Sequence, residues 1–483
     1  MNELNPQTSP KQLSDLMLGL GVYSKDITIT HLCDDTRKLQ AGDTFLCLPR
    51  VQNKRALVQQ AIDKQAASVI FVGEAEQGLD IVCACLPDMQ AAGTLLRRWF
   101  ETEQTSVQCI GITGTDGKTS TAWMLREILE KYHGSAWSVG TLGWMKAADN
   151  LMDLGNTTPS LFNNHRLLAL AQQQDIAALV FEVSSHGIAQ QRIAGLPFAA
   201  AIWTTMGYDH LEDHGGFENY LSLKSSFMQS VLQAGGAVVA NADYEHIRAA
   251  LSQADDVFWY GAKKADLSWA VEGQSVVMTT NQEKVTFHNV SVADFHAENL
   301  AAVAGVMHAL YAISLHEFAE YAQGVSTPLG RLEAVGEQVY IDYAHTAEGL
   351  QRCLLSARKL TQDKLLLVFG CGGNRDKSKR PVMGAVAETY ADECWLTSDN
   401  PRDEQQQDIA ADVLAGIKHA EAIHVVEDRA LAITQAVNAL ANQDVLVIAG
   451  KGHESYLEVA GKRLPWSDKD VAEQALAEVQ LCA

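Results

Sequence analysis

Residues 107–129, VQCIGITGTDGKTSTAWMLREIL, place a glycine-rich turn between an apolar, strand-like run and the start of a helix. Such a turn points successive backbone N–H groups at a polyphosphate, and the helix N-terminus adds positive potential. Lys118 would reach the β- and γ-phosphates, and the Thr119 hydroxyl would ligate Mg²⁺. The strict phosphate-loop pattern wants glycine at position 112, where the chain has Ile112. We therefore predict an ATP or GTP site; the alternative is a glycine-rich turn with a solvated lysine.

Three further residues with metal-binding or phosphate-binding chemistry follow later strand-like runs. Glu182 ends the apolar run ALVFE, His210 lies just past AAAIWTT, and Lys224 falls on a later amphipathic segment. Taken singly, they read as a capping glutamate, a core histidine and a surface lysine. Functional groups of α/β sheets gather at the carboxyl ends of strands, and phosphate-bridging cations need hard oxygen ligands. Glu182 and Thr119 fit that requirement, and the convergence of all three residues on the strand edges of the phosphate loop favours a functional role over these separate readings.

Two polar segments have the residue types that hold an anionic substrate. NTTPS (156–160) is rich in hydroxyls and amides, and SSHGIAQQR (184–192) ends in Arg192, which can pair with a carboxylate or phosphate. The alternative is ordinary loop and N-cap chemistry.

The last third of the chain carries three motifs that each follow an apolar run. They are GCGGNRDKSKR (370–380), LTSDNPRDE (396–404) and IAGKGHES (448–455). Arg375 and Arg402 can grip a carboxylate bidentately, and Glu454 would complement an ammonium. All three segments lie at carboxyl ends of strands, the expected binding edge of a sheet.

The elements that must position these residues alternate between short apolar runs and amphipathic segments, which predicts a doubly wound parallel α/β architecture. We expect strands near 107–112, 178–183, 199–204 and 236–240, a small antiparallel insertion over 257–292, and a complete Rossmann-like domain after residue 326. The expected domains are 1–88, a small α/β unit; 89–325, a central phosphate-loop sheet; and 326–483.

Length and composition agree with this plan. At roughly 150 residues per domain, 483 residues predict about three domains, and 47% apolar with 20% charged residues excludes wholesale disorder. The net charge is 37 − 59 = −22, which argues against a non-specific nucleic-acid or anionic-membrane binder. Nine cysteines without a C-x-x-C pair, no signal segment and only short apolar runs predict a soluble, cytoplasmic protein.

The loop TGTDGKTST resembles the TGTNGKTTT loop of the Mur ligase superfamily, the ATP-dependent amide-bond-forming enzymes of peptidoglycan synthesis, with Asp116 in place of the usual asparagine. The resemblance spans essentially the whole chain. It implies ATP as co-substrate, Mg²⁺ as cofactor, and Arg331 over the γ-phosphate, with Asp342 near the ribose and Asn299 near the adenine. The residues implied in ATP binding are Gly114, Thr115, Asp116, Gly117, Lys118, Thr119, Ser120, Asn299, Arg331 and Asp342.

The resemblance also implies roles for the other motifs. Its catalytic residues would be Lys118, Glu182, His210, Lys224 and Arg331. The metal would be held by Thr119, Glu182, His210 and Lys224, the lysine being carbamylated to N6-carboxylysine. The UDP-N-acetylmuramoyl dipeptide would be held by Thr36, Asn156, Thr157, Thr158, Ser184, Gln190 and Arg192. In the first domain, Asp35-Thr36-Arg37 resembles the family's uridine-pocket motif, whereas the G-x-x-x-D-G-H that usually follows is missing.

The tetrapeptide Asp399-Asn400-Pro401-Arg402 accompanies meso-diaminopimelate as the added amino acid in one branch of the family, and lysine-adding relatives depart from it at the arginine. The resemblance thus assigns diaminopimelate binding to Arg375, Asp399, Asn400, Pro401, Arg402, Gly450 and Glu454. Diaminopimelate carries a second carboxylate that lysine lacks, and Arg375 and Arg402 are suited to bind it.

The expected function is an ATP-dependent ligase that adds meso-diaminopimelate to UDP-N-acetylmuramoyl-L-alanyl-D-glutamate through an acyl phosphate, with domain closure around the substrates. Its expected partners are small molecules only, with no nucleic acid and no membrane, and the chain is expected to be a monomer. Three alternatives stay open: a lysine-adding ligase, a MurF-like or folylpolyglutamate-synthase-like ligase, and a nucleotide-binding regulatory module that has lost turnover. Intact Lys118, Glu182, His210 and Lys224 disfavour the last.

Overall fold

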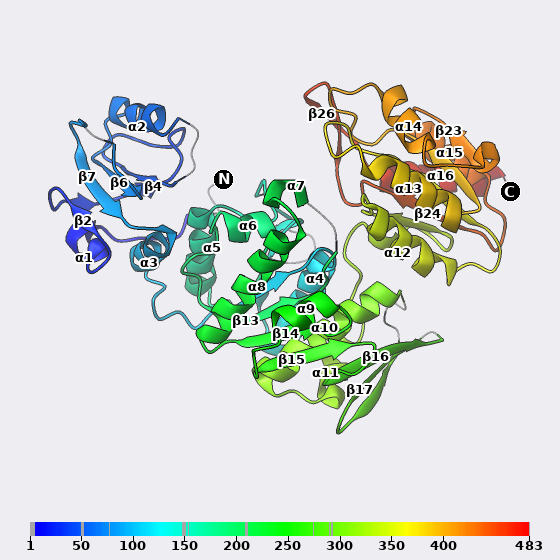
Figure 1. Cartoon of the computed structure of the whole chain (residues 1–483), viewed down its shortest axis with the longest axis horizontal. Coiled ribbons are helices and arrows are strands. Elements are labelled where there is room, and N and C mark those ends of the chain that lie inside the picture. The colour runs from blue at the N-terminus through cyan, green and yellow to red at the C-terminus, as the bar shows by residue number, and fades with distance from the viewer. Residues whose placement is uncertain are drawn as a thin grey trace. The chain divides into compact units, whose positions relative to one another are not determined.

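The structure is a computed structural model that describes residues 5–49, 53–76, 78–146, 151–152, 154–207, 211–273, 275–288, 290 and 293–482. It divides into two compact units (Figure 1): one comprises Met1–Tyr260 with Ala302–Tyr321, and the other comprises Gly261–Ala301 with Ala322–Ala483. Within the described ranges, no helix is both long and apolar enough to cross a membrane.

The first unit begins with a small α/β layer, as the sequence predicts for residues 1–88. Its five-stranded sheet has the order β2-β7-β6-β5-β4, parallel except where the edge strand β2 pairs antiparallel with β7. Its elements are α1 (Leu13–Met17), β2 (Val22–Tyr23), β4 (Leu32–Cys33), β5 (Thr44–Cys47), α2 (Lys54–Asp63), β6 (Ser68–Val72) and β7 (Val82–Leu86). In the same part of the chain, β1 (Lys11–Gln12) and β3 (Thr28–Ile29) pair antiparallel as a separate two-stranded ribbon.

The larger sheet of the first unit carries the phosphate-loop segment on its central strand. Strands β9, β12, β8, β13, β14 and β15 are parallel neighbours in that order, as expected for apolar runs buried on both faces. Its elements are α3 (Met89–Trp99), β8 (Gln108–Thr113), α4 (Lys118–His133), β9 (Ala136–Gly140), β10 (Gly143–Met145), β11 (Leu151–Met152), α5 (Leu161–Gln173), β12 (Ala178–Glu182), α6 (Ser185–Ala189), β13 (Phe198–Trp203), α7 (Leu211–His214), α8 (Phe217–Gln233), β14 (Ala237–Asn241), α9 (Glu245–Ala250) and β15 (Val257–Gly261).

The register of this sheet brings the carboxyl ends of three strands to one edge. Glu182 lies opposite Ile112, and Trp203 lies opposite Thr113, the last residue of β8. Because the strands are parallel, the segments that follow them emerge side by side at this edge. The loop after β8, the loop after β12 and the loop after β13 are therefore neighbours.

Two features of the larger sheet differ from the sequence expectation. β10 pairs antiparallel with β9 and with β11, so the sheet is not parallel throughout. The expected antiparallel insertion over 257–292 is wrong at its start, because β15 continues the parallel sheet beside β14. The antiparallel part is a meander in the second unit, made of β16 (Leu267–Glu272), β17 (Ser275–Thr280) and β18 (Lys284–Phe287).

The second unit contains the expected Rossmann-like sheet, with order β19-β20-β24-β21-β22-β23, parallel except at the edge strand β19. Its elements are β19 (Arg331–Ala334), β20 (Val339–Asp342), α12 (Ala347–Arg358), β21 (Leu365–Phe369), α13 (Lys379–Tyr390), β22 (Glu393–Leu396), α14 (Gln406–Leu414), β23 (Ile423–Val425), α15 (Arg429–Asn438), β24 (Val445–Ala449), β25 (Tyr456–Val459), β26 (Lys462–Pro465) and α16 (Asp468–Cys482). Two further helices, α10 (Asp294–Tyr311) and α11 (Leu315–Ala322), precede this sheet in the chain.

Helices cover both faces of this sheet, as its strand pattern requires (Figure 1). Along β21, Leu367 joins the cluster that includes α12, α13 and α14, whereas Val368 joins the cluster with α15 and α16. Successive side chains of a strand point to opposite faces, so a continuous apolar run needs a helical layer on each side. The doubly wound architecture predicted from the sequence is confirmed.

Candidate functional site

The loop between β8 and α4 has a backbone that only glycine allows at two positions. Gly114 has φ +156° and Gly117 has φ +86°. A Cβ on Gly114 would lie 2.0 Å from the Thr204 hydroxyl oxygen, so the loop packs directly against the segment that follows β13. The turn thus begins and ends on glycines, and α4 starts at Lys118, as predicted.

Two threonines after β13 fix the shape of this loop. The Asp116 N–H donates to Thr205 Oγ1 at 2.7 Å, and the Asp116 carbonyl accepts from Thr204 Oγ1 at 2.6 Å. The Thr115 N–H donates to the Thr205 carbonyl at 3.1 Å. Position 116 therefore serves the loop through its backbone, which is independent of the side chain that occupies it.

Two lysines of the predicted site converge on the same loop. The Lys118 ammonium donates to the carbonyls of Gly114, at 2.7 Å, and Thr115, at 2.8 Å. The Lys224 ammonium, on α8, donates to the Gly114 carbonyl at 2.9 Å and to Thr113 Oγ1 at 3.4 Å. Lys224 is only 1% exposed, so its reading as a surface lysine is wrong.

Glu182 is a buried carboxylate surrounded by donors. Its Oε2 accepts from Thr119 Oγ1 at 2.9 Å and from Thr141 Oγ1 at 3.0 Å, and its Oε1 accepts from the Thr141 N–H at 2.9 Å. Burial raises the pKa of the Glu182 carboxyl, while the Lys118 charge and the threonine hydrogen bonds lower it. Gly140 makes room for the carboxylate, because a Cβ there would lie 2.0 Å from Glu182 Oε1.

The donor set at this position suits a hard divalent cation. A buried carboxylate joined to a hydroxyl supplies the oxygen ligands that Mg²⁺ prefers. In the part of the chain that the structure describes, no three His, Cys, Asp or Glu side chains gather into a metal-binding group. His210, the third predicted metal ligand, lies outside the described residues.

The loop NTTPS lies against the same glutamate. Thr158 Oγ1 donates to the Glu182 carbonyl at 2.9 Å, accepts from the Ser184 N–H at 2.9 Å and lies 3.0 Å from Ser184 Oγ. Thr157 Oγ1 lies 3.2 Å from Thr141 Oγ1. Ser184 caps α6 by accepting from the Gly187 N–H at 3.1 Å.

Arg192 links the two polar segments predicted to hold an anion. It donates to the Thr158 carbonyl at 2.7 Å and to Gln190 Oε1 at 2.7 and 3.0 Å, and partial burial lowers its pKa. Asn156 is exposed. The buried Thr36, in the turn after β4, donates to Gln60 Oε1 of α2 at 3.0 Å. The structure thus joins Ser184, Gln190 and Arg192 to the threonine loop, whereas Thr36 belongs to the small N-terminal α/β layer.

In the second unit, the residues predicted to contact ATP occupy the start of its sheet. The Arg331 guanidinium carbon lies 4.7 Å from the centre of the Tyr343 ring. The buried Asp342 carboxylate accepts from the N–H groups of Leu332 and Ala344, both at 2.7 Å. Asn299, on α10, is 2% exposed.

The tetrapeptide after β22 forms a buried polar cluster with the loop after β24. Asn400 Nδ2 donates to Glu454 Oε2 at 2.9 Å, and Asn400 Oδ1 accepts from Lys451 Nζ at 3.1 Å. Lys451 also donates to Glu454 Oε2 at 2.9 Å and lies 3.7 Å from Asp399 Oδ1. Gly450 has φ +112°, and a Cβ there would lie 2.9 Å from Asp399 Oδ2.

The two arginines predicted to hold a carboxylate border the same glycine. A Cβ on Gly372 would lie 3.1 Å from Arg402 Nη1 and 3.9 Å from Arg375 Cγ. Arg402 has φ +54° and donates to the Gly373 carbonyl at 2.7 Å and to Glu458 Oε2 at 3.1 Å, whereas Arg375 is exposed. The structure therefore brings the Arg402 guanidinium and the side-chain stem of Arg375 to the same glycine turn.

A buried ion pair shapes this loop. Arg380 is fully buried and donates to both oxygens of Glu404, at 2.9 and 3.0 Å, and to Asp412 at 2.8 Å. Hydrogen bonds to Glu404 from Arg380, from the Asn374 N–H and from Lys377 lower the pKa of its carboxyl to about 2. Glu404 also accepts from the Asn374 N–H, which holds the turn that carries Arg375.

Sequence reasoning missed three residues that hold the site together. Thr205 follows the carboxyl end of a predicted strand, where polar residues could have been singled out, whereas Thr141 follows β9, which was not predicted. Lys451 stands one residue after Gly450 in IAGKGHES, and nothing in the sequence around it indicates that it is buried. Its complete burial makes it part of the polar cluster.

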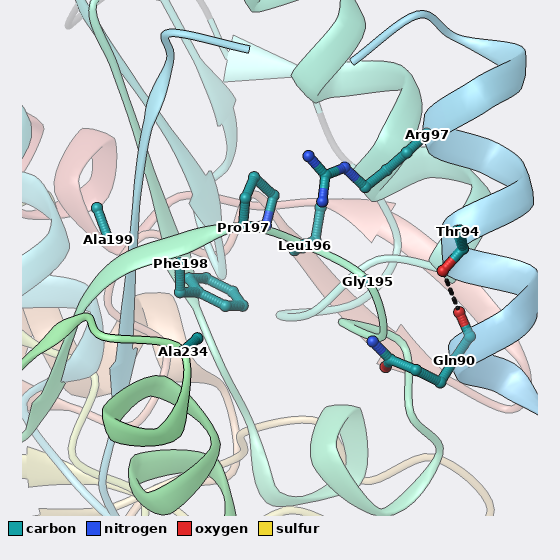
Figure 2. A pocket seen from close by; sticks show the side chains of 9 residues that line it. All are labelled: Gln90, Thr94, Arg97, Gly195, Leu196, Pro197, Phe198, Ala199 and Ala234. Carbon is teal, nitrogen blue, oxygen red and sulfur yellow. Dashed lines mark hydrogen bonds between the residues drawn. The ribbon is translucent and has the colours of Figure 1, made fainter. Parts of the chain in front are cut away.

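A cavity of about 380 Å³ opens elsewhere in the first unit (Figure 2). It lies at Phe198, the first residue of β13, and thus at the opposite edge of the sheet from the phosphate loop. Its lining is mostly apolar, with Arg97 as its one charged residue. The nine lining residues are Gln90, Thr94, Arg97, Gly195, Leu196, Pro197, Phe198, Ala199 and Ala234.

Comparisons with known proteins match both units. Residues 112–307 match the family described as the Mur ligase middle domain, and residues 330–452 match the Mur ligase, glutamate ligase domain. A UDP-N-acetylmuramoyl-L-alanyl-D-glutamate–2,6-diaminopimelate ligase of Coxiella burnetii is 35% identical over 474 residues, 93% of this chain and 96% of that one.

Solved structures agree with these matches. A structure of a UDP-N-acetylmuramoyl-L-alanyl-D-glutamate–2,6-diaminopimelate ligase superposes with a TM-score of 0.70 at 25% identity, covering 98% of this chain and 99% of that one. A MurF ligase of Thermotoga maritima, in complex with ADP, shares the fold with a TM-score of 0.62 at 16% identity, covering 94% and 98%.

Proposed function

Because this chain belongs to the Mur ligase family, as its match to relatives along nearly its whole length establishes, we propose that it joins meso-2,6-diaminopimelate to UDP-N-acetylmuramoyl-L-alanyl-D-glutamate. It is an ATP-dependent ligase of peptidoglycan precursor synthesis. The observation that carries the choice of amino acid is the cluster after β22 and β24. The support for this choice is that Asn400, two residues before Arg402, donates to Glu454, and that Arg402 and the stem of Arg375 border the same glycine turn.

The reaction must convert a poor electrophile into a good one. A γ-carboxylate oxygen of the D-glutamate attacks the γ-phosphorus of ATP, the bond to ADP breaks, and an acyl phosphate forms. The diaminopimelate amine then attacks the carbonyl carbon and loses a proton, and phosphate leaves. Negative charge builds up on the phosphoryl oxygens in the first step, so fixed cations beside them lower its barrier.

Lys118 is the fixed cation in the first unit. Its ammonium now donates to two carbonyls of its own loop, and we propose that it exchanges them for phosphate oxygens when ATP binds. Thr204 and Thr205 hold the loop backbone in place during this exchange. The roles predicted for Asn299, Arg331 and Asp342 at the nucleotide stay predictions.

Glu182 and Thr119 would hold Mg²⁺, for which their oxygen atoms are suited. When bound, the ion would supply positive charge beside the β- and γ-phosphates. A bound cation also favours the ionised form of Glu182, which burial disfavours.

Lys224 is the residue that we propose to be carbamylated. Loss of one proton from the ammonium, addition of CO₂ to Nζ and loss of a second proton turn this buried cation into an anion. The Nζ lies 2.9 Å from the Gly114 carbonyl oxygen, so an anion at this position needs a cation beside it. We therefore expect carbamylation and Mg²⁺ binding to depend on each other.

The carbamate has a direct test. Intact mass under mild conditions should show CO₂ on the wild type and not on Lys224→Ala. Lys224→Ala should lose activity, and a short-chain carboxylic acid should restore part of it. Absence of rescue in a folded variant would count against the carbamate.

The choice of amino acid is tested by phosphate release. With the UDP-dipeptide and ATP present, we expect release with diaminopimelate and a rate lower by up to about 10⁴ with lysine, which leaves the arginines without their carboxylate. Arg402→Ala should lose most of this preference. No release with either amino acid would refute the ligase function, and release with lysine only would refute the role of Arg402.

The remaining assignments follow from this function. We propose that residues 1–88 bind the UDP end, with Thr36 at the uridine, that residues 89–325 hold ATP and the dipeptide, and that residues 326–483 bind the incoming amino acid. Thr157, Thr158, Ser184 and Arg192 would hold the dipeptide. We also propose a cytoplasmic monomer whose partners are its small-molecule substrates.

A further inference from the structure

The buried lysine after β24 has no role in the function described so far. Lys451 is 0% exposed, and lysine is almost never fully buried unless its charge is paired. Its ammonium donates to Glu454 Oε2 and to Asn400 Oδ1, at 2.9 and 3.1 Å, and lies 3.7 Å from Asp399 Oδ1. The ring of Tyr456 lies beside it, 5.5 Å from Nζ to the ring centre.

These contacts fix which atoms of the amino-acid cluster remain for a ligand. Oε2 of Glu454 accepts from both Lys451 and Asn400, so Oε1 is the oxygen left to receive a further donor. Oδ1 of Asn400 accepts from Lys451 and, at 2.8 Å, from the Glu458 N–H, which sets the orientation of the amide.

The charges of the cluster also leave a preference for a cation. Asp399 and Glu454 supply two negative charges against the positive charge of Lys451, while Arg429, whose charge also acts on both carboxylates, is paired with Asp468. The excess negative charge attracts an ammonium, whereas Arg375 and Arg402 lie at the neighbouring glycine turn and attract a carboxylate. A zwitterionic amino acid matches this separation.

We propose that Lys451 is a positioning residue of the amino-acid site. It holds Glu454 and Asn400 so that the free oxygen of Glu454 receives an ammonium group of the incoming amino acid. Lys451 contacts these side chains and not the substrate. This inference rests on the proposed function, because the amino acid is the ligand that the cluster would bind.

The test is Lys451→Met, which keeps most of the side-chain volume and removes the ammonium. Losing a charge-assisted hydrogen bond should raise KM for diaminopimelate about tenfold or more, with a smaller change in kcat. KM for ATP and for the UDP-dipeptide should stay within about twofold of wild type, because those sites use other residues.

Two further variants separate positioning from a general loss of structure. Lys359→Met is the matched control, because it removes an ammonium of the same unit that pairs with Asp294 at the surface. It should leave every KM unchanged. Lys451→Gln keeps a hydrogen-bond donor, and it should recover part of the affinity for diaminopimelate that Lys451→Met loses.

Each outcome decides the proposal. A rise in KM confined to diaminopimelate supports it. An unchanged KM for diaminopimelate, an equal rise for all three substrates, or failure of both Lys451 variants to fold overturns it, since the lysine would then serve stability alone. Failure of the proposed function would look different, because the wild type itself would release no phosphate with diaminopimelate.

Discussion

At the scale of single residues, the site in the first unit depends on space as much as on charge. Glu182 is 3% exposed and receives three hydrogen bonds from Thr119 and Thr141. The carboxylate occupies the position where a side chain on residue 140 would begin. A glycine that does no chemistry therefore determines where the carboxylate lies.

Gly140→Ala should displace Glu182, because the added Cβ would lie 2.0 Å from its Oε1. A displacement of about 1 Å in a catalytic group lowers turnover about 10²-fold, and the rate of phosphate release measures this loss. Ser138→Ala, on the same strand β9, is the matched control and should keep wild-type turnover. Wild-type turnover in Gly140→Ala would show that the carboxylate can move without loss.

The residue types in the sequence predicted many of the site residues, but the side chains that hold these residues in place could not be predicted. Lys118 and Thr119 were predicted from the glycine-rich turn, and Glu182 was predicted from its place at a strand end. In the structure, Thr119, just after that turn, donates a hydrogen bond to Glu182. Lys451 could not be found, because burial depends on tertiary packing that a single sequence does not display. The roles of the predicted residues stay predictions, although the family resemblance that suggested them is confirmed.

At the scale of elements, a buried ion pair joins two helices of the second unit to its sheet. Arg429 begins α15 and donates to both carboxylate oxygens of Asp468, at the start of α16, at 2.6 and 2.7 Å. It also donates to the carbonyls of Ser398 and Ala449, which follow or end strands β22 and β24. Ser398 and Ala449 directly precede Asp399 and Gly450, so this pair contacts the start of both loops that form the amino-acid cluster.

Arg429→Met should destabilise the second unit by about 3–5 kcal/mol, because it leaves the Asp468 carboxylate buried and unpaired. Denaturant unfolding measures this loss. Adding Asp468→Leu should restore much of the stability, since neither charge is then buried. If the double variant is no more stable than Arg429→Met, the loss comes from the hydrogen bonds to the two strands instead.

The element pattern was more predictable than its pairing. Apolar runs predicted four strands of the first unit's larger sheet, β8, β12, β13 and β14, to within a residue or two, because buried strands need continuous apolar sequence. An apolar run does not show whether its strand pairs parallel or antiparallel with its neighbours. The expected antiparallel start at residue 257 was wrong because β15 has the same apolar character as its parallel neighbours.

At the scale of the whole molecule, buried histidines link stability to pH. Burial lowers the pKa of His165 and His453 to about 4 and that of His296 to about 3. The unfolded chain binds these protons near pH 6.5, and the folded chain binds them only at lower pH. Stability is therefore complete above pH 6.5 and decreases as the pH falls toward 4, by about 1.4 kcal/mol per pH unit for each histidine.

Urea unfolding between about pH 7.5 and 5 checks this dependence. His165→Gln should show a shallower loss of stability on acidification than wild type, because its side chain no longer binds a proton in the unfolded chain. The glutamine amide can still donate to the Ala194 carbonyl, which His165 contacts at 2.9 Å. Equal slopes for the two proteins would contradict the assignment of this titration to His165.

One residue of the first unit belongs to two predicted ligand sites at once. The Glu182 carboxylate accepts from Thr119 at the start of α4, and its backbone carbonyl accepts from Thr158 in the polar loop. A ligand that shifts either threonine therefore acts on a residue that the other threonine also contacts. By thermodynamic linkage, the factor by which nucleotide changes affinity for the UDP-dipeptide must equal the factor by which the dipeptide changes affinity for nucleotide.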